Sequence, residues 1–239
     1  MERLDKILSN LGYGSRKEIK SIVKKGLVEI DGKLAKDNGM QVDPEASVIK
    51  VNGEEIVYKK YIYLMMNKPD GVISATHDKY DETVVDLLYA EDAIFEPFPV
   101  GRLDKDTVGL LLLTNDGELN HKLISPKHHV DKVYYAEIDK GVNEEDIKAF
   151  EKGIVLDDGY KCMPAKLEII ESDTEGARVH VTLQEGKFHQ VKRMFESVGK
   201  KVVYLRRISF GGLPLDESLE EGEYRELTEE ELKVLRRED

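Results

Sequence analysis

The stretch VGRLDKDTVGLLLLTNDG, residues 100–117, sets an Arg and two Asp residues shortly before four consecutive leucines. Leu110 to Leu113 form an apolar run that is expected to be buried, whereas Arg102, Asp104 and Asp106 are costly to bury. In many surface loops such charges pair with one another and cap the end of a strand. Alternatively, the buried segment fixes a loop whose charged side chains act in a functional site, and the stretch alone leaves both interpretations open.

The spacing of Asp104 and Asp106 can be compared with that in two classes of enzyme that use catalytic carboxylates. Phosphotransferases that form an aspartyl phosphate carry DxDxT directly after a buried strand. Here the order is D-K-D-T, one residue short, and the apolar run follows the acids. A glycosidase with two carboxylates fits the residue types, but no other part of the sequence indicates a sugar-binding groove.

The composition predicts one large or two smaller domains, because the chain has 239 residues and 40% of them are hydrophobic. No run of about 18 or more apolar residues is present, so no membrane span is predicted. The N-terminus lacks the apolar block of a signal peptide. Cys162 is the single cysteine, which excludes an internal disulfide and favours the reducing cytoplasm. No Cys/His cluster or phosphate-binding loop occurs, so no metal site is predicted.

The net charge of −12 argues against a nucleic-acid partner, but the charges are distributed unevenly. Residues 1–60 hold 12 Lys and Arg against 10 Asp and Glu, a balance of +2, so the remainder carries −14. The end of the chain, residues 216–239, holds 11 acids and 4 bases. This acidic segment is expected to be a solvated surface remote from any RNA.

Residues 1–58 read as a small module of two helices followed by short hairpins. Apolar residues recur at helical spacing over residues 4–11. Ser15 and Glu18 form a capping-box pattern that opens a second helix. Alternation over residues 28–30 then leads to a tight-turn signal at Asp31 and Gly32.

The second helix of this module is strongly basic. It carries one acid, Glu18, and five cations: Arg16, Lys17, Lys20, Lys24 and Lys25. One interpretation is an ordinary solvated helix surface, which is what most runs of charged residues form. The other interpretation is a stripe of cations that contacts phosphate groups.

Residues 59–239 read as a larger second domain that mixes strands and helices without a regular βαβ repeat. Strands are predicted over residues 61–66, 133–138, 165–170 and 177–183, and helices over residues 84–88, 118–124, 144–152 and 190–198. Periodicity cannot decide between strand and buried helix for Leu110 to Leu113. The pattern favours an α+β fold with a mostly antiparallel sheet.

Two further segments carry candidate functional residues. EGKFHQVKRM, residues 185–194, places Lys192 and Arg193 near the start of a helix, where they form either an ordinary basic surface or a cation that keeps a carboxylate ionised. DKVYYAEI, residues 131–138, alternates as a strand and puts Tyr134 and Tyr135 on opposite faces. One of these tyrosines is expected in the core, and the other could stack on an extruded base.

Taken together, the motifs resemble those of bacterial pseudouridine synthases. NKPDG, GRLDKDTVGLLLLTNDG, SPKHHVDKVYYAEI, EGKFHQVKRMF and LRRISFGGLPL occur in this order across residues 67–215. The N-terminal module, with RLDK, GYGSRKE and KKGLVEIDGK, resembles the S-four-like RNA-binding domain. The resemblance implies that residues 1–58 bind RNA and that residues 59–239 form the catalytic domain.

The resemblance also implies roles for individual residues. The GRLD match makes Asp104 the catalytic carboxylate, as base or as nucleophile, with Tyr134 stacked on the base and Lys192 as the basic partner of the Asp. Arg193 is the fallback for that partner and an RNA contact. The further implied contacts are Arg102, Arg16, Lys17 and Lys20 for RNA, and Val191 and Leu205 for the uracil pocket. No cofactor is required, since the reaction adds no external group.

Within the family, SPKHH and the acidic C-terminal segment resemble enzymes that act on small-subunit (16S) ribosomal RNA, either free or in a precursor particle. The predicted function is therefore site-specific isomerisation of a uridine in this RNA during ribosome biogenesis. Two alternatives stay open: action on large-subunit (23S) RNA, and a non-catalytic RNA-binding assembly factor. A phosphohydrolase using Asp104 is a third and weaker one.

Overall fold

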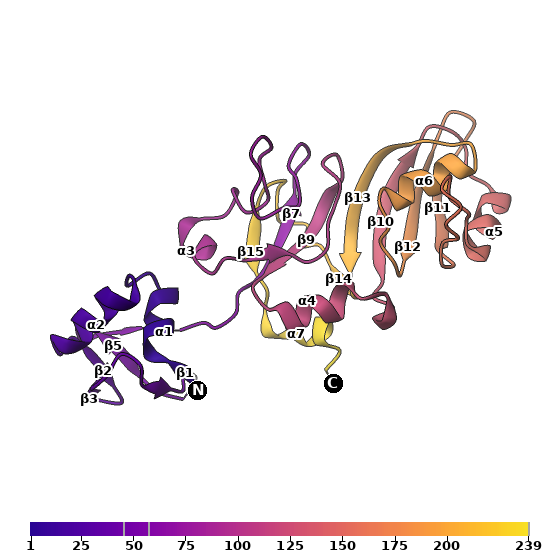
Figure 1. The fold of residues 1–239 in the computed structure, drawn as a ribbon. Coiled ribbons are helices and arrows are strands. Elements are labelled where there is room, and N and C mark those ends of the chain that lie inside the picture. Colours follow the sequence, from indigo (N-terminus) through magenta and orange to yellow (C-terminus); the bar gives the residue numbers. More distant parts are fainter. Residues whose placement is uncertain (45, 57, 239) are drawn as a thin grey trace. The chain divides into compact units, whose positions relative to one another are not determined.

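The computed structural model describes residues 1–44, 46–56 and 58–238. They form two compact units (Figure 1): unit 1 comprises residues 1–62 and 89–96, and unit 2 comprises residues 63–88 and 97–239. No helix of the described residues is long and apolar enough to cross a bilayer.

The described part of unit 1 is built from three helices and short antiparallel strands. Its four-stranded sheet has the order β3-β2-β5-β6, and β1 pairs with β4. The predicted capping box is confirmed, because the Glu18 carboxylate accepts from the Ser15 backbone N–H at 2.7 Å and the Ser15 hydroxyl accepts from the Glu18 N–H. The elements are α1 (Leu4–Asn10), α2 (Arg16–Lys24), α3 (Ala90–Ala93), β1 (Glu2–Arg3), β2 (Val28–Ile30), β3 (Lys33–Leu34), β4 (Gln41–Val42), β5 (Ile49–Val51) and β6 (Glu54–Ile56).

Unit 2 is organised around one sheet of the order β11-β12-β10-β13-β9-β7-β15, with β14 on β13 and β8 on β9. Its described strand pairs are antiparallel except β13 with β9. The α+β prediction is confirmed. The strands are β7 (Tyr63–Lys68), β8 (Phe98–Pro99), β9 (Val108–Thr114), β10 (Lys132–Ile138), β11 (Lys166–Ser172), β12 (Ala177–Leu183), β13 (Val202–Phe210), β14 (Leu213–Pro214) and β15 (Tyr224–Glu226).

Helices cover parts of this sheet. The helices α5 and α6 meet through the rings of Phe150 and Phe195, whose centroids are 4.9 Å apart, and α6 crosses in front of the strands (Figure 1). A short 3₁₀ turn, η1, links α4 to β10. The helical elements are α4 (Gly117–Ile124), η1 (Pro126–His128), α5 (Glu144–Lys152), α6 (Gln190–Ser197) and α7 (Glu229–Arg236).

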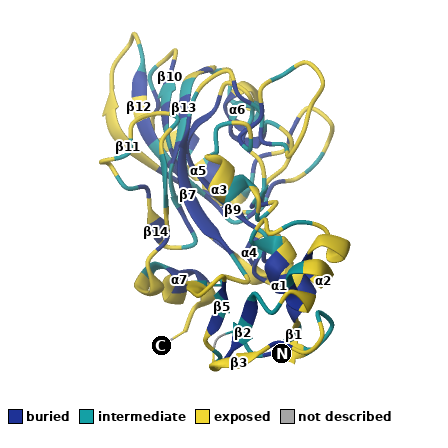
Figure 2. Cartoon of the chain, turned by 90° about the vertical axis from the view of Figure 1, so that its left-hand side faces the viewer, coloured by how far each residue is buried: buried dark blue, intermediate teal, exposed yellow. Residues whose placement is uncertain are grey.

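The leucine run of residues 110–113 lies in β9, where every residue is buried. A strand buried on both faces has no polar alternation, which is why its periodicity resembled that of a buried helix. The central strands of unit 2 are accordingly dark blue in Figure 2. Gly109 lies opposite Arg207 where β9 pairs with β13, and a Cβ at this position would overlap the carbonyl oxygen of Arg207. Glycine therefore allows β9 and β13 to pair directly after the loop that carries Asp104.

The helix predicted over residues 84–88 is wrong. This segment forms turns. The Asp86 carboxylate accepts from both the backbone N–H and the hydroxyl of Thr83, at 2.8 Å each, which closes a single turn. The backbone N–H groups of Asp86 and Leu88 donate to the carbonyls three residues before them, so the segment makes short turns and no helix.

Candidate active site

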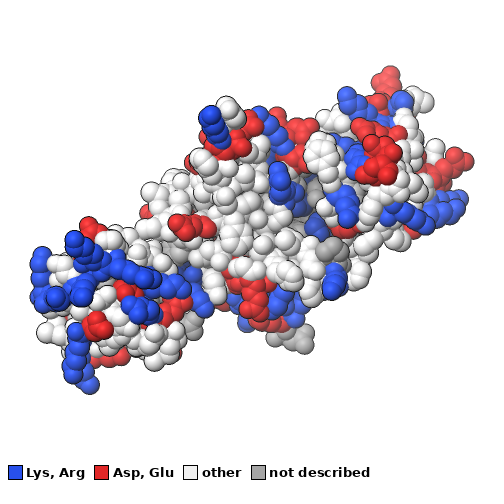
Figure 3. Space-filling model, viewed as in Figure 1, with Lys and Arg blue, Asp and Glu red and all other residues white. Residues whose placement is uncertain are grey.

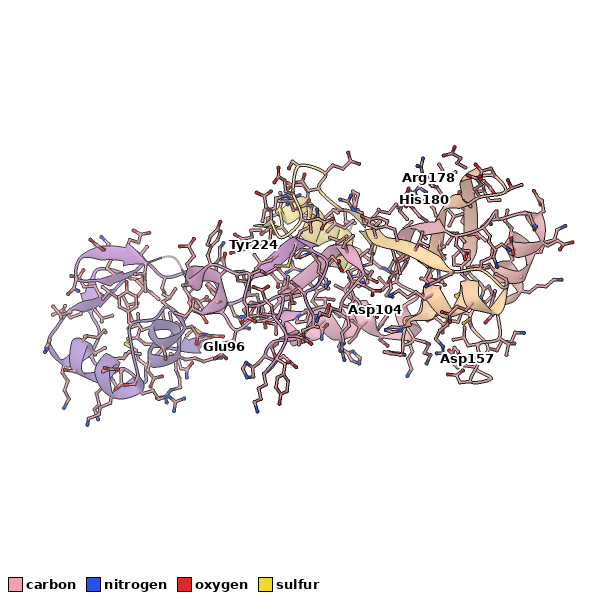
Figure 4. All side chains as sticks on the ribbon, turned by 90° about the horizontal axis from the view of Figure 1, so that it is seen from above. Glu96, Asp104, Asp157, Arg178, His180 and Tyr224 are labelled. Atoms are coloured by element: carbon pink, nitrogen blue, oxygen red, sulfur yellow. The ribbon has the colours of Figure 1, made fainter. Side chains whose placement is uncertain are left out.

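A cleft of about 810 Å³ lies in unit 2, between the loop of residues 100–107, the strands β10 and β13, and the segment before α6. Five of the predicted site residues line it: Arg102, Asp104, Tyr134, Val191 and Leu205. Figure 4 shows Asp104 between the central strands of unit 2 and the part that carries α6. The tertiary fold therefore gathers residues from four separate sequence motifs around one space.

Asp104 meets a cation in this cleft. The ammonium of Lys192 lies 3.3 Å from Asp104 Oδ2 and 2.6 Å from Asp106 Oδ1. The hydrogen bond from Lys192 lowers the pKa of the Asp106 carboxyl. On the other side of Asp104, His189 Nε2 lies 3.6 Å from Oδ1. The Asp104 side chain is one-quarter exposed, so a ligand in the cleft can reach its carboxylate.

The backbone on both sides of Asp104 is held by hydrogen bonds to other parts of unit 2. The Ser74 hydroxyl donates to the carbonyl of Leu103 at 2.9 Å and accepts from the Leu103 N–H at 3.0 Å. After Asp104, the carbonyl of Lys105 accepts from the Gly71 N–H at 3.0 Å. The turn closes when Thr107 N–H donates to the Asp104 carbonyl at 3.1 Å. The carboxylate is thus presented by a loop that is fixed at both ends.

Lys68 also holds the loop that carries Asp104. Its side chain is fully buried, and its ammonium donates to the carbonyls of Pro69, Lys105 and Thr107 at 2.9, 3.2 and 3.0 Å. Burial lowers the pKa of Lys68 to about 8. Lys68 was not predicted as a site residue, and in the sequence it belongs to the NKPDG motif. The available signal was its position at the end of an otherwise buried strand, ahead of Pro-Asp-Gly.

Tyr134 lies on the cleft face of β10. It is buried and stands directly opposite Arg207 on β13. Tyr135 points to the other face, as the alternation predicts, where its ring packs edge-on against Tyr204 and His180 with centroids 6.1 and 6.3 Å apart. Of the two tyrosines, Tyr134 is therefore the one whose ring a ligand in the cleft can meet.

Lys192 and Arg193 are neighbours on α6 but have different partners. The guanidinium of Arg193 binds the carboxylates of Asp157 and Asp158, the latter at 2.6 Å. Arg193 does not line the cleft. In Figure 4, Asp157 lies apart from Asp104, beyond α6. The structure thus brings Lys192, and not Arg193, to Asp104.

The remaining predicted cations lie on exposed surfaces. Arg102 is exposed at the cleft and makes no ion pair with another described residue. Arg16, Lys17 and Lys20 lie exposed on α2, without an ion pair among the described residues of unit 1. Figure 3 shows Lys and Arg side chains gathered on this face of unit 1, over α2.

Cations outnumber acids in the cleft. The charged lining residues are Arg102, Lys105, Lys132, Lys187 and Arg207 against Asp81, Asp104 and Glu185. Lys132 and Arg207 were missed by the sequence analysis, although their alternation with Tyr134 and Leu205 along two strands was a usable signal. This local excess of positive charge suits an anionic polymer, in contrast to the net charge of −12 of the whole chain.

Two family models match the chain. One, described as RNA pseudouridylate synthase, covers residues 62–197, and the other, described as S4 domain, covers residues 2–48. The first spans the loop of Asp104, the strand of Tyr134 and the helix of Lys192. The second spans the basic helix α2.

Individual relatives are similar to this protein along almost the whole chain. An uncharacterized RNA pseudouridine synthase of Bacillus subtilis, YtzG, is 56% identical over 98% of both chains. The ribosomal small subunit pseudouridine synthase A of Vibrio cholerae is 42% identical over 96% of this chain and 97% of its own.

The ribosomal large subunit pseudouridine synthase B of Bacillus subtilis is 38% identical over 99% of this chain and 96% of its own. A crystal structure of a pseudouridylate synthase superposes with a TM-score of 0.69 at 38% identity, covering 98% of this chain and all of that one. The chain therefore belongs to the RNA pseudouridine synthase family, whose members isomerise uridine to pseudouridine in RNA, and it carries an RNA-binding S4 domain.

Proposed function

We propose that Asp104 is the catalytic carboxylate of this enzyme, that Lys192 keeps it ionised, and that the target uracil stacks on Tyr134. The observation that carries the proposal is the fixed loop: hydrogen bonds to Ser74, Lys68 and Gly71 hold the backbone on both sides of Asp104. Such support is what a catalytic group needs in order to be aimed at a reacting atom. The ammonium of Lys192 lies 3.3 Å from the Asp104 carboxylate and forms an ion pair with it.

The reaction breaks the N1–C1′ bond of uridine, rotates the uracil and joins C5 to C1′. In this scheme Asp104 acts on the ribose, either by bonding to C1′ or by removing the C2′ proton. The uridine leaves its stack and enters the cleft, while Arg102 at the rim fills the space that it vacates or grips a phosphate. Val191 and Leu205, both buried in the cleft wall, line the uracil pocket.

Replacing Asp104 by Asn tests this assignment. We expect tritium release from 5-³H-uridine-labelled transcript to be abolished while RNA affinity is retained. Asp106→Asn is the matched control, because Asp106 also contacts Lys192 but is exposed, and its loss should be far smaller. Equal losses in the two variants would show that Asp104 has no special role. A wild-type protein that binds ribosomal RNA without releasing tritium from it would support the non-catalytic assembly factor.

We further propose that the substrate is small-subunit (16S) ribosomal RNA in the cytoplasm. The support is the SPKHH motif, the acidic C-terminal segment and the likeness to a small-subunit enzyme at 42% identity. The competing candidate is large-subunit RNA, because a large-subunit enzyme is 38% identical. Pseudouridine mapping in cells that lack the protein separates them: a site lost from 16S RNA supports the proposal, and a site lost only from 23S RNA overturns it.

The S4 domain is proposed to hold RNA through Arg16, Lys17 and Lys20 on α2. Phosphate contacts release counterions, so each lost contact on a duplex should reduce the salt dependence of log K by about 0.9. Neutralising the three residues should therefore weaken binding and flatten the dependence of affinity on salt. An unchanged slope would place the RNA on another surface.

A further inference from the structure

Two cations at the floor of the cleft have no acidic partner. Lys132 on β10 and Arg207 on β13 flank the ring of Phe210, with Lys132 Nζ 5.4 Å and Arg207 Cζ 4.9 Å from its centroid. Neither makes an ion pair with any residue of the described chain. Glu185, which also lines the cleft, is occupied, because its carboxylate accepts from Tyr160, Gln190 and the N–H of Met163.

Both cations keep donors that no described residue uses. The Lys132 ammonium makes one hydrogen bond, to the carbonyl of Val130 at 3.1 Å. Arg207 is only 2% exposed; its Nε donates to the carbonyl of Leu110 at 2.7 Å, but its buried Nη2 has no partner. Burial, and next the charge of Arg207, lower the pKa of Lys132 to about 8. Unpartnered buried donors are costly, and a ligand oxygen in the cleft would satisfy them.

The strand register places these donors beside the base-stacking position. Arg207 is the direct cross-strand partner of Tyr134, and Lys132 lies two residues from Tyr134 on the same face of β10. A uracil stacked on Tyr134 would therefore have both cations close by. Phosphate groups stay on the outside of an extruded nucleotide, where the exposed cations Arg102, Lys105 and Lys187 line the cleft.

We propose that Lys132 and Arg207 stabilise the negative charge that develops on the uracil when its N1–C1′ bond breaks, an inference that rests on the proposed function of Asp104. The electron pair of this bond moves to N1 and is delocalised onto O2 and O4. In compensation, C1′ bonds to an Asp104 oxygen, or C2′ gives a proton to that carboxylate. When C5 later bonds to C1′, the bond between C1′ and Asp104 breaks or C2′ takes its proton back from Asp104, so the carboxylate is regenerated. The ring then loses the C5 proton and N1 takes up a proton, so the isomerisation balances.

Single-turnover kinetics with two substrates test this inference. Transcripts carrying either uridine or 5-fluorouridine at the target position are incubated with excess enzyme, and the loss of the starting nucleoside is followed after nuclease digestion. Fluorine at C5 stabilises the uracil anion, so cleavage depends less on cations of the protein. The variants are Lys132→Met, Lys132→Arg and Arg207→Lys, with Lys140→Met as control, because Lys140 donates to the carbonyl of Gly199 outside the cleft.

We expect Lys132→Met to slow uridine cleavage about 10²-fold, the usual cost of removing one preorganised donor to a developing anion. The loss should be clearly smaller with 5-fluorouridine, and Lys132→Arg should recover most of the rate because it keeps the charge. Arg207→Lys keeps a charge but not the orientation of the guanidinium, and should show the same substrate dependence with a smaller loss.

Two results would overturn the inference. An equal loss on both substrates, with weaker RNA binding and a flatter salt dependence, would show that these cations hold a phosphate. A Lys132→Met variant as fast as wild type would show that they do not act in the reaction. In both cases the role of Asp104 stands, because Asp104→Asn is compared with wild type separately. Inactivity of the wild type itself would instead contradict the proposed function.

Discussion

Lys68 and Lys132 are two buried or partly buried lysines of the same unit that differ in how many of their donors are used. Burial lowers the pKa of each from 10.5 to about 8. Lys68 donates to three carbonyls, whereas Lys132 donates to one and lines the cleft. Burial and a lowered pKa are therefore common to both lysines and do not by themselves identify a functional one. The number of unused donors separates a lysine that supports a loop from one that can bind a ligand.

The largest expected effect is on the stability of a Lys68→Met variant. Removing the ammonium leaves three carbonyls without their donor, and the free energy of unfolding should fall by about 3 kcal/mol. Activity should fall with it, because the Lys105 and Thr107 carbonyls position the loop of Asp104. Urea unfolding monitored by circular dichroism measures the first effect. If Lys68→Met were as stable and as active as the wild type, Lys68 would not be a lysine that supports the loop of Asp104.

A smaller effect is expected from Ser74→Ala, which loosens the same loop on its other side. The variant removes the hydroxyl that bonds both the N–H and the carbonyl of Leu103. The loss of one buried hydrogen-bonding group should lower the free energy of unfolding by about 1 kcal/mol. Turnover should fall more than RNA affinity does, because the change displaces Asp104 without touching a binding surface. A loss of affinity alone would contradict this account.

Lys132→Met should change the stability least of the three substitutions, by less than about 0.5 kcal/mol, although it slows the reaction. Removal of a desolvated charge offsets the loss of its single hydrogen bond to Val130. Activity would thus fall while stability is nearly unchanged, whereas a residue that supports the fold, such as Lys68, should lose both when it is replaced. A destabilisation equal to that of Lys68→Met would show that Lys132 is a second structural lysine.

A further prediction is a dependence of stability on pH. In the unfolded chain these lysines keep their protons up to about pH 10.5, whereas in the folded protein they lose them near pH 8. Between these values the unfolded state binds more protons, so the free energy of unfolding should rise with pH. Tyr58 and Tyr63, whose pKa values are raised to about 12 by burial, oppose the rise above about pH 10.

The test is urea unfolding from about pH 7 to about pH 10, the interval in which the lysines dominate. The rise should be smaller in Lys132→Met, which has lost one of the two groups. An unfolding free energy that falls steadily with pH in the wild type would mean that the two lysines are not depressed in the folded state.

Much of the fold followed from short-range patterns. The capping box of Ser15, the helical spacing over residues 4–11 and the alternation of β10 each depend on neighbours a few residues apart, and each was predicted. The segment 84–88 shows the limit of this reasoning. A hydrogen-bonded Thr83–Asp86 pair starts a turn in the same way as it starts a helix, and only the packing of the following residues decides whether the turn continues.

The candidate site was predicted less completely. The motifs named Asp104, Tyr134 and Lys192, and the structure brings all three to one cleft or its edge. The supporting Lys68 and the floor cations Lys132 and Arg207 were missed, because strand position alone does not show which carbonyls or rings surround a cation. Arg193 could not be separated from Lys192, because two consecutive cations on a helix look alike until their partners are known.

The local elements and the order of the motifs could be read from the amino-acid sequence, since they depend on residues that are close along the chain. Other features became visible only in the folded chain: the contact of Lys192 with Asp104, that of Arg193 with Asp157 and Asp158, the three carbonyls around Lys68, and the unused donor of Arg207. The physical reason is separation: Lys192 and Asp104 are 88 residues apart, and Arg207 and Leu110 are 97 apart. Such contacts form only when β9 and β13 pair, and no local pattern encodes which donors that pairing leaves free.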